Sequence, residues 1–166
     1  MFLSVGHFVQ SWEAEMNSTI KLLELLKDES LKKPEHSDIR NIGRVAWHII
    51  TTIPEMLEKL GINAGGPTEK DPIPADAAEI VGAYRKHASC LMDAVKKWKD
   101  EDMFIEDEMY GEKWQRGITL WILIKHEIHH RGQMTILMRL AGLPVAGIYG
   151  PAREEWNKYG MEVPKL

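Results

Sequence analysis

The stretch HEIHHRGQ, residues 126–133, places many polar and titratable side chains in a segment whose neighbours are mostly apolar. His126 and His130 are four positions apart, so on a helix their side chains point in nearly the same direction, roughly 40° apart. Their Cβ atoms would lie about 6 Å from each other, a spacing at which two imidazoles can bind one metal ion. Ile122 and Leu137 share this helical face, so we expect the pair to point into the protein interior.

A third histidine is suitably placed to complete a metal site. His48, in the segment GRVAWHIITTIPEM, lies at the edge of the apolar face of an upstream helix. Helical bundles build metal sites from side chains on facing helices. We therefore predict that His48, His126 and His130 bind a divalent transition metal, with zinc or nickel as the favoured ions. Three neutral imidazoles leave the ion its full charge and a fourth position open for water or a thiolate.

Two other interpretations of the same residues stay open. Histidines at this spacing can form a hydrogen-bonded structural pair, and a boundary histidine such as His48 can simply be part of the packing. The segment also matches HEXXH, the metalloprotease pattern in which Glu127 would be the general base. We rank that pattern second, because no further ligand motif follows downstream. On a helix, Glu127 also lies about 100° from His126.

The remaining polar residues of this helix have expected roles around the predicted site. Gln133 shares the face of the histidine pair and is expected to orient His130 or a bound water. His129 is expected to contact the ligands from outside or to pack against the bundle. Arg131 projects away from the pair, which favours an ion pair with an acidic residue. Gly132 costs a helix ~1 kcal/mol relative to alanine, which predicts that another segment approaches closely there.

Elsewhere, few side chains indicate chemistry. We expect solvated positions for His7, His36 and His87. Cys90 is interpreted as a small core residue. Two arginines are available to hold an anionic substrate, Arg139 and Arg153.

The elements that must position these residues are helical. Apolar residues at helical spacing predict four helices, over residues 7–30, 38–60, 75–99 and 118–141. Pro54 lies inside the second and is expected to kink it or remove one backbone hydrogen bond. Residues 61–76 are predicted to form a loop, and Tyr110-Gly111-Glu112 the tip of a short hairpin. The tail that begins at Leu143 is predicted to be irregular or to hold one short helix. We therefore predict an all-α fold, a four-helix bundle in a single domain over residues 1–166.

Composition limits the classes of function. With 166 residues and 44% hydrophobic residues, the chain can bury one core. A net charge of −4 argues against nucleic acid as a partner. No apolar run reaches the ~18 residues of a membrane span, and the N-terminal residues lack the features of a signal peptide. A single cysteine cannot form an intrachain disulfide, so we expect a cytoplasmic protein.

Taken together, HEIHHRGQM, the upstream segment IGRVAWHI, the early Trp12 and the C-terminal LPVAGIYGPAREEW resemble the DinB family of bacterial four-helix proteins (DinB/YfiT-like). The resemblance covers nearly the whole chain. It implies a divalent metal held by three histidines, which map to His48, His126 and His130, and a homodimer. It also implies similarity to transferases and isomerases that use small thiols.

The sequence thus leaves three functional hypotheses. The first is a metal-dependent thiol transferase with a small-molecule thiol as substrate. The second is a non-enzymatic metal-binding stress or accessory protein, in which a fourth protein ligand would close the site. The third is a metal-dependent hydrolase that uses Glu127 as base.

Overall fold

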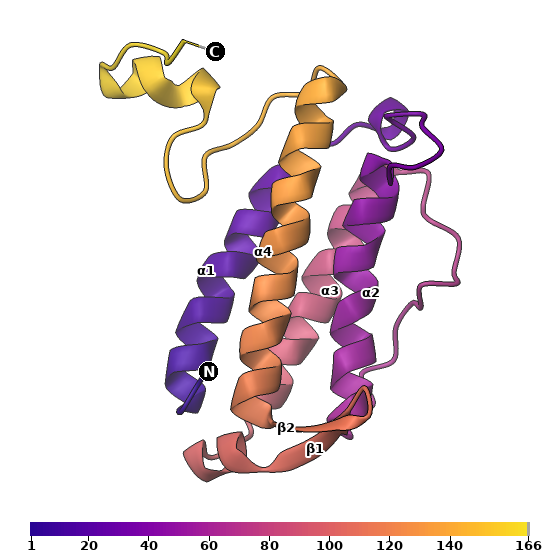
Figure 1. Ribbon diagram of the computed structural model, residues 1–166, viewed down its shortest axis with the longest axis vertical. Helices are drawn as coiled ribbons and strands as arrows, with labels where there is room; N and C mark the ends of the chain where they lie inside the picture. Colours follow the sequence, from indigo (N-terminus) through magenta and orange to yellow (C-terminus); the bar gives the residue numbers. More distant parts are fainter. Residues whose placement is uncertain (166) are drawn as a thin grey trace.

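The computed structural model describes residues 1–165 and confirms the predicted four-helix bundle (Figure 1). Within these residues the four α-helices are α1 (Val5–Leu23), α2 (Ile42–Lys59), α3 (Ala77–Val95) and α4 (Arg116–Leu140). They run side by side along the long axis of the molecule, and α2 packs against both α3 and α4. No helix within residues 1–165 is both long and apolar enough to cross a membrane.

Three of the four helices are capped at their N-terminus by a side chain of the preceding residue. The side chains of Ser4, Asn41 and Asp76 each accept a hydrogen bond from a backbone N–H in the first turn of α1, α2 and α3, respectively. The cap at Asn41 explains why α2 begins four residues later than predicted, because the backbone of Asn41 is extended and the helix can begin only after it. Pro54 lies inside α2 as predicted, and its ring cannot donate the usual helical hydrogen bond.

Short elements close the two ends of the bundle. The predicted first helix was too long: α1 ends at Leu23, and the chain turns through the short 3₁₀ helix η1 (Asp28–Ser30) before α2. Between α3 and α4 lie η2 (Asp100–Phe104) and an antiparallel hairpin of β1 (Glu106–Met109) and β2 (Glu112–Gln115). Tyr110 and Gly111 form its turn with positive φ angles of 55° and 84°, as a two-residue hairpin turn requires.

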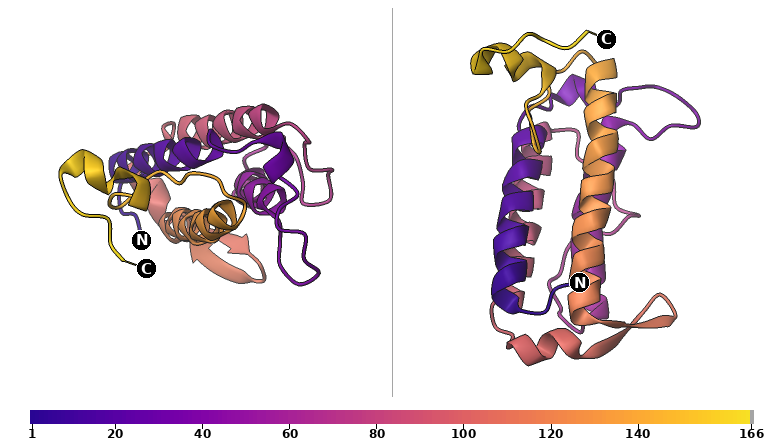
Figure 2. Two further views of the ribbon diagram at one scale, coloured as in Figure 1. Left: turned by 90° about the horizontal axis from the view of Figure 1, so that it is seen from above. Right: turned by 60° about the vertical axis from the view of Figure 1, so that its left-hand side comes forward.

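The core lies between the four helices, and the C-terminal segment stays outside it. Trp12 and Tyr84 are among the largest fully buried side chains, and the indole of Trp12 donates a 3.0 Å hydrogen bond to the carbonyl of Ala88. After α4 the chain folds back along the bundle and then departs from it through η3 (Arg153–Tyr159), which buries none of its residues (Figure 2). The tail was predicted to be irregular or to hold one short helix, and η3 is that short helix.

Candidate metal centre

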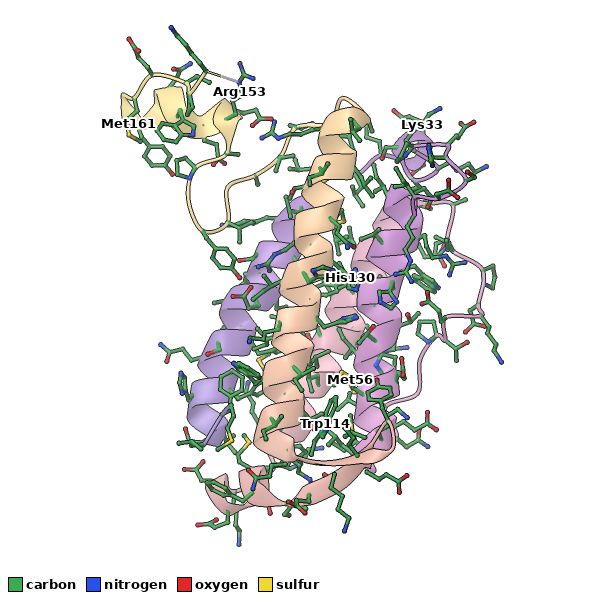
Figure 3. The ribbon with its side chains drawn as sticks, viewed as in Figure 1. Lys33, Met56, Trp114, His130, Arg153 and Met161 are labelled. Carbon is green, nitrogen blue, oxygen red and sulfur yellow. The ribbon has the colours of Figure 1, made fainter. Side chains whose placement is uncertain are left out.

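The predicted ligands come from two neighbouring helices. His48 lies near the middle of α2, whereas His126 and His130 lie one turn apart on α4. Figure 3 shows His130 on the side of α4 that faces α2. Because α2 and α4 pack against each other along the bundle, the three imidazoles meet between them. His130 is buried, and His48 and His126 are half-buried.

Their Nε2 atoms converge on one point. Nε2 of His126 lies 3.2 Å from Nε2 of His48 and 3.1 Å from Nε2 of His130. Around a tetrahedral ion with metal–nitrogen bonds of about 2.05 Å, two ligand nitrogens would be about 3.3 Å apart. The observed spacing is therefore close to that of ligands sharing one ion, and the cluster has the geometry to hold one.

The positions of the ring protons also favour a cation between the three rings. Nδ1 of His130 lies 2.8 Å from Oε1 of Gln133, and Nδ1 of His48 lies 3.3 Å from Oε2 of Glu69. Both oxygens can only accept, so in the neutral form of each ring the proton lies on Nδ1 and Nε2 presents a lone pair. Two lone pairs thus face Nε2 of His126, which can donate to one of them at most. A divalent cation would satisfy all three nitrogens.

Electrostatics keep two of the rings neutral, as metal ligands must be. Burial, together with the neighbouring charges of His130 and His48, lowers the pKa of His126 to about 4. Burial also lowers the pKa of His130, against the opposing effect of its hydrogen bond with Gln133. Near neutral pH these lone pairs are therefore available for a metal.

Contacts outside the cluster hold the rings in place, as predicted for Gln133. Its amide bridges two histidines, since Oε1 accepts from His130 and Nε2 donates over 3.0 Å to His129. His129 itself is exposed, and besides this bridge its ring lies edge-on to the ring of His130, with 5.0 Å between the ring centroids. Sequence reasoning therefore placed both residues around the ligands correctly.

Glu69 was missed, because nothing in its segment, residues 61–76, marked it as part of a site. This loop runs beside α2, and Glu69 contacts one face of the helix. Its carboxylate accepts a 2.9 Å hydrogen bond from Thr51, contacts His48 and lies 3.6 Å from Arg44. Burial acts to raise the pKa of Glu69, but the hydrogen bonds with Thr51 and His48 outweigh it and the pKa is lowered. The carboxylate therefore stays charged and fixes the His48 ring.

Glu127 does not belong to the histidine cluster, although it is adjacent in sequence. It is fully buried toward α1 and α3, where its Oε1 accepts hydrogen bonds of 2.6 Å from Thr19 and 2.7 Å from Tyr84. Burial raises the pKa of Glu127. The HEXXH interpretation therefore lacks its base, because this carboxylate bonds to the helix core and not to a group beside the histidines.

Arg131 forms the predicted ion pair, on the same side of α4 as Glu127. Its guanidinium lies 2.6 Å from a carboxylate oxygen of Glu15 and donates a 2.7 Å hydrogen bond to the hydroxyl of Tyr149. Arg131 thus joins α4 to α1 and to the C-terminal segment. The helix carries histidines toward α2 and this acid–base network toward α1 and α3.

Several other expectations need correction. His87 was expected to be solvated, but it is 3% exposed and packs beside Pro54 and Gly66, where burial lowers its pKa. Gly132 was expected to allow a close approach, yet no described residue lies within 4 Å of the position its Cβ would take. Cys90 is half-buried and not part of the core.

The remaining sequence candidates lie outside the cluster. His7 and His36 are exposed, as predicted. Arg139 is an ion-pair partner, because its guanidinium lies 2.8 Å from Glu154. Arg153 lies in η3, on the segment that leaves the bundle.

Comparison with known proteins gives consistent results. The model of the DinB family matches residues 1–163. The chain is 42% identical to the uncharacterized protein YrdA of Bacillus subtilis (strain 168), over the full length of both. A crystal structure of a DinB-like protein from Bacillus cereus ATCC 10987 is 41% identical and superposes with a TM-score of 0.85, covering 90% of this chain and 100% of the other. A second crystal structure, of the DinB-like protein YjoA from Bacillus subtilis, is 16% identical and superposes with a TM-score of 0.68. The match covers 88% of this chain and 99% of the other, and it supports the fold alone.

Proposed function

The chain belongs to the DinB family, and we propose that it is a metal-dependent enzyme that transfers a small-molecule thiol to an electrophile. The proposed ligands of the divalent metal, zinc or nickel, are His48, His126 and His130. The observation that carries the proposal is the convergence of three Nε2 atoms, two of them fixed as lone pairs by Nδ1 hydrogen bonds.

The number of ligands supports a reactive site over a structural one. Structural zinc sites normally use four protein ligands, whereas catalytic sites use three and keep one position open. Within residues 1–165, no further histidine, cysteine, aspartate or glutamate joins the three histidines. The ion, when bound, would supply positive charge that lowers the pKa of a thiol placed beside it.

The chain itself contributes orientation and access. Gln133 and Glu69 hold the rings of His130 and His48, so that the ligand nitrogens stay aimed at one point. In the transfer, a sulfur–carbon bond forms, the leaving group departs with the bonding electrons, and the thiol proton passes to solvent. The substrate supplies the nucleophile, and this chain need not provide one.

The test is a thiol-transfer assay with defined metal content. The full chain is loaded with Zn²⁺ or Ni²⁺ and mixed with cysteine, or another low-molecular-weight thiol, and 1-chloro-2,4-dinitrobenzene, whose adduct absorbs light. We expect turnover that depends on metal and is lost in His126→Ala. Equal rates with and without metal, across several thiols and electrophiles, would contradict the proposal. Metal bound without turnover would favour a non-enzymatic metal-binding protein.

The quaternary structure is a separate expectation. The family resemblance implies a homodimer, and we propose that the chain forms one. Sedimentation equilibrium would test it, with a mass near twice the 19.0 kDa of one chain as the expected result. A single species of the monomer mass at micromolar concentration would contradict it.

A further inference from the structure

A cleft opens beside the histidine cluster at the end of the bundle where α2 begins and α4 ends. It has a volume of about 550 Å³, within the range of small-molecule sites. His130 and Gln133 are among the residues that line it. The other lining residues come from the segment before α2, from the first turn of α2 and from the last turns of α4: Asp38, Ile39, Arg40, Val45, Ile136, Leu137 and Leu140.

The walls of this cleft are apolar and unusually open to solvent. Ile39, Ile136 and Leu140 are 47%, 63% and 71% exposed, although each is a large hydrophobic residue. Exposed apolar surface beside a concave site is typical of ligand-binding grooves. A bound apolar group would remove these side chains from water, and its burial would contribute to affinity.

Arg40 gives the cleft a positive charge that can bind an anion. The guanidinium has no hydrogen bond or ion pair with another residue of 1–165, whereas Arg44, one turn along, contacts Glu69. The first N–H groups of α2 are already used, since those of Ile42, Gly43 and Arg44 donate to Lys33, Leu31 and Asn41. An anion in this cleft would therefore pair with the Arg40 side chain and not with the backbone N–H groups of α2.

The position of Arg40 relative to the histidines supports this role. Arg40 and His130 line the same cleft, Arg40 from the segment before α2 and His130 from α4. Asp38 also lines the cleft, two positions before Arg40. An anion held by Arg40 in this cleft would therefore lie beside His130, one of the three proposed metal ligands.

We propose that this cleft binds an amphipathic anion, a small molecule with an apolar body against α4 and a carboxylate paired with Arg40. Such a ligand would present its reactive group to the histidine cluster from the side of His130. The inference rests on the proposed function in one respect, because it names the class of thiol that the metal site would take. Recognition of the carboxylate depends on Arg40 alone and can be measured separately.

The first arm of the test compares two thiols that differ only in charge. The full chain loaded with Co²⁺ is titrated with 6-mercaptohexanoate and with 6-mercaptohexan-1-ol, and the sulfur-to-cobalt charge-transfer band gives each Kd. We expect the acid to bind at least about tenfold more tightly, as one charged hydrogen-bonding pair provides. Arg40→Gln should abolish this preference. Lys113→Gln is the matched control, because it removes an equal charge from the exposed hairpin and should leave the preference unchanged.

The second arm tests the apolar wall. In the unaltered protein, 6-mercaptohexanoate should bind at least about tenfold more tightly than 3-mercaptopropionate, because its three additional methylenes are buried. Leu140→Asn should reduce this difference, and with a side chain 71% exposed it should not disturb folding. Equal binding of the acid and the alcohol, or a preference unchanged by Arg40→Gln, would overturn the inference.

The third arm separates this inference from the proposed function. Binding of hexanoate and hexan-1-ol, which lack a thiol, is followed by NMR on the Zn²⁺-loaded chain. If hexanoate binds in an Arg40-dependent way but neither thiol produces a charge-transfer band, the cleft inference stands and the thiol proposal falls. If both thiols produce the band with equal affinity, the thiol proposal stands and the cleft inference falls.

Discussion

Gln133 offers a sensitive test of how the proposed metal site is held. In Gln133→Ala, Nδ1 of His130 loses its 2.8 Å hydrogen bond, and the bridge to His129 disappears. Removing a group that orients a metal ligand typically costs 10–100-fold in metal affinity. Gln133 is exposed, so water can replace part of its bond. We therefore expect the lower end, about tenfold, which corresponds to about 1.4 kcal/mol.

The measurement is a competition for Zn²⁺ against a chromophoric chelator at pH 7.5. Thr135→Ala is the matched control, since Thr135 lies on the same helix and its hydroxyl donates a hydrogen bond to the carbonyl of Gly132, away from the histidines. The control should bind Zn²⁺ as tightly as the unaltered protein. A change of less than twofold in Gln133→Ala, or an equal change in both variants, would refute the view that Gln133 orients His130.

Further predictions concern His126 in the histidine cluster, and Glu127 and Tyr149 in the hydrogen-bond network on the other side of α4. The His126 ring should titrate near pH 4 by NMR in the metal-free protein, and a value near its ordinary ~6.5 would contradict the burial argument. Since this pKa is lowered, the unfolded state binds more protons, and metal-free stability should fall as pH falls from ~6.5 toward 4. Glu127→Ala should lose roughly 2–4 kcal/mol in urea unfolding, because the hydroxyls of Thr19 and Tyr84 lose their buried acceptor. Its metal content should be unchanged, and loss of metal would show that Glu127 supports the cluster. Tyr149→Phe removes two hydrogen bonds that hold the C-terminal segment to the bundle, so trypsin should cleave this segment faster, with an unchanged rate as the contrary result.

The helices and the histidine cluster were predictable because local patterns encode them. Spacing of four on one helix brings His126 and His130 together whatever the remaining fold, and the apolar stripe of α2 turns His48 toward the same interior. The role of Gln133 follows from the same periodicity, since it lies three positions after His130. These assignments needed only the geometry of one helix and the rule that apolar faces meet.

Contacts made by loops were not predictable in this way. Glu69 reaches His48 from a loop, and the packing of that same loop near Gly66 buries His87, which has polar neighbours in sequence. His87 did carry a signal, because it follows Tyr84 by three residues and so lies near the buried stripe of α3. Helix ends also depended on caps, such as Asn41, that compete with the apolar pattern.

The central claim is that three histidines bind one metal ion, and metal content measures it most directly. Elemental mass spectrometry of the purified chain, after reloading with Zn²⁺ or Ni²⁺, is compared with His48→Ala/His126→Ala/His130→Ala. His7→Ala/His36→Ala serves as a control that removes exposed histidines only. We expect about one ion per chain in the unaltered protein and the control, and none in the triple variant. An unaltered protein that retains no metal after reloading would contradict the account, and HEIHHRGQ would then be a polar packing motif.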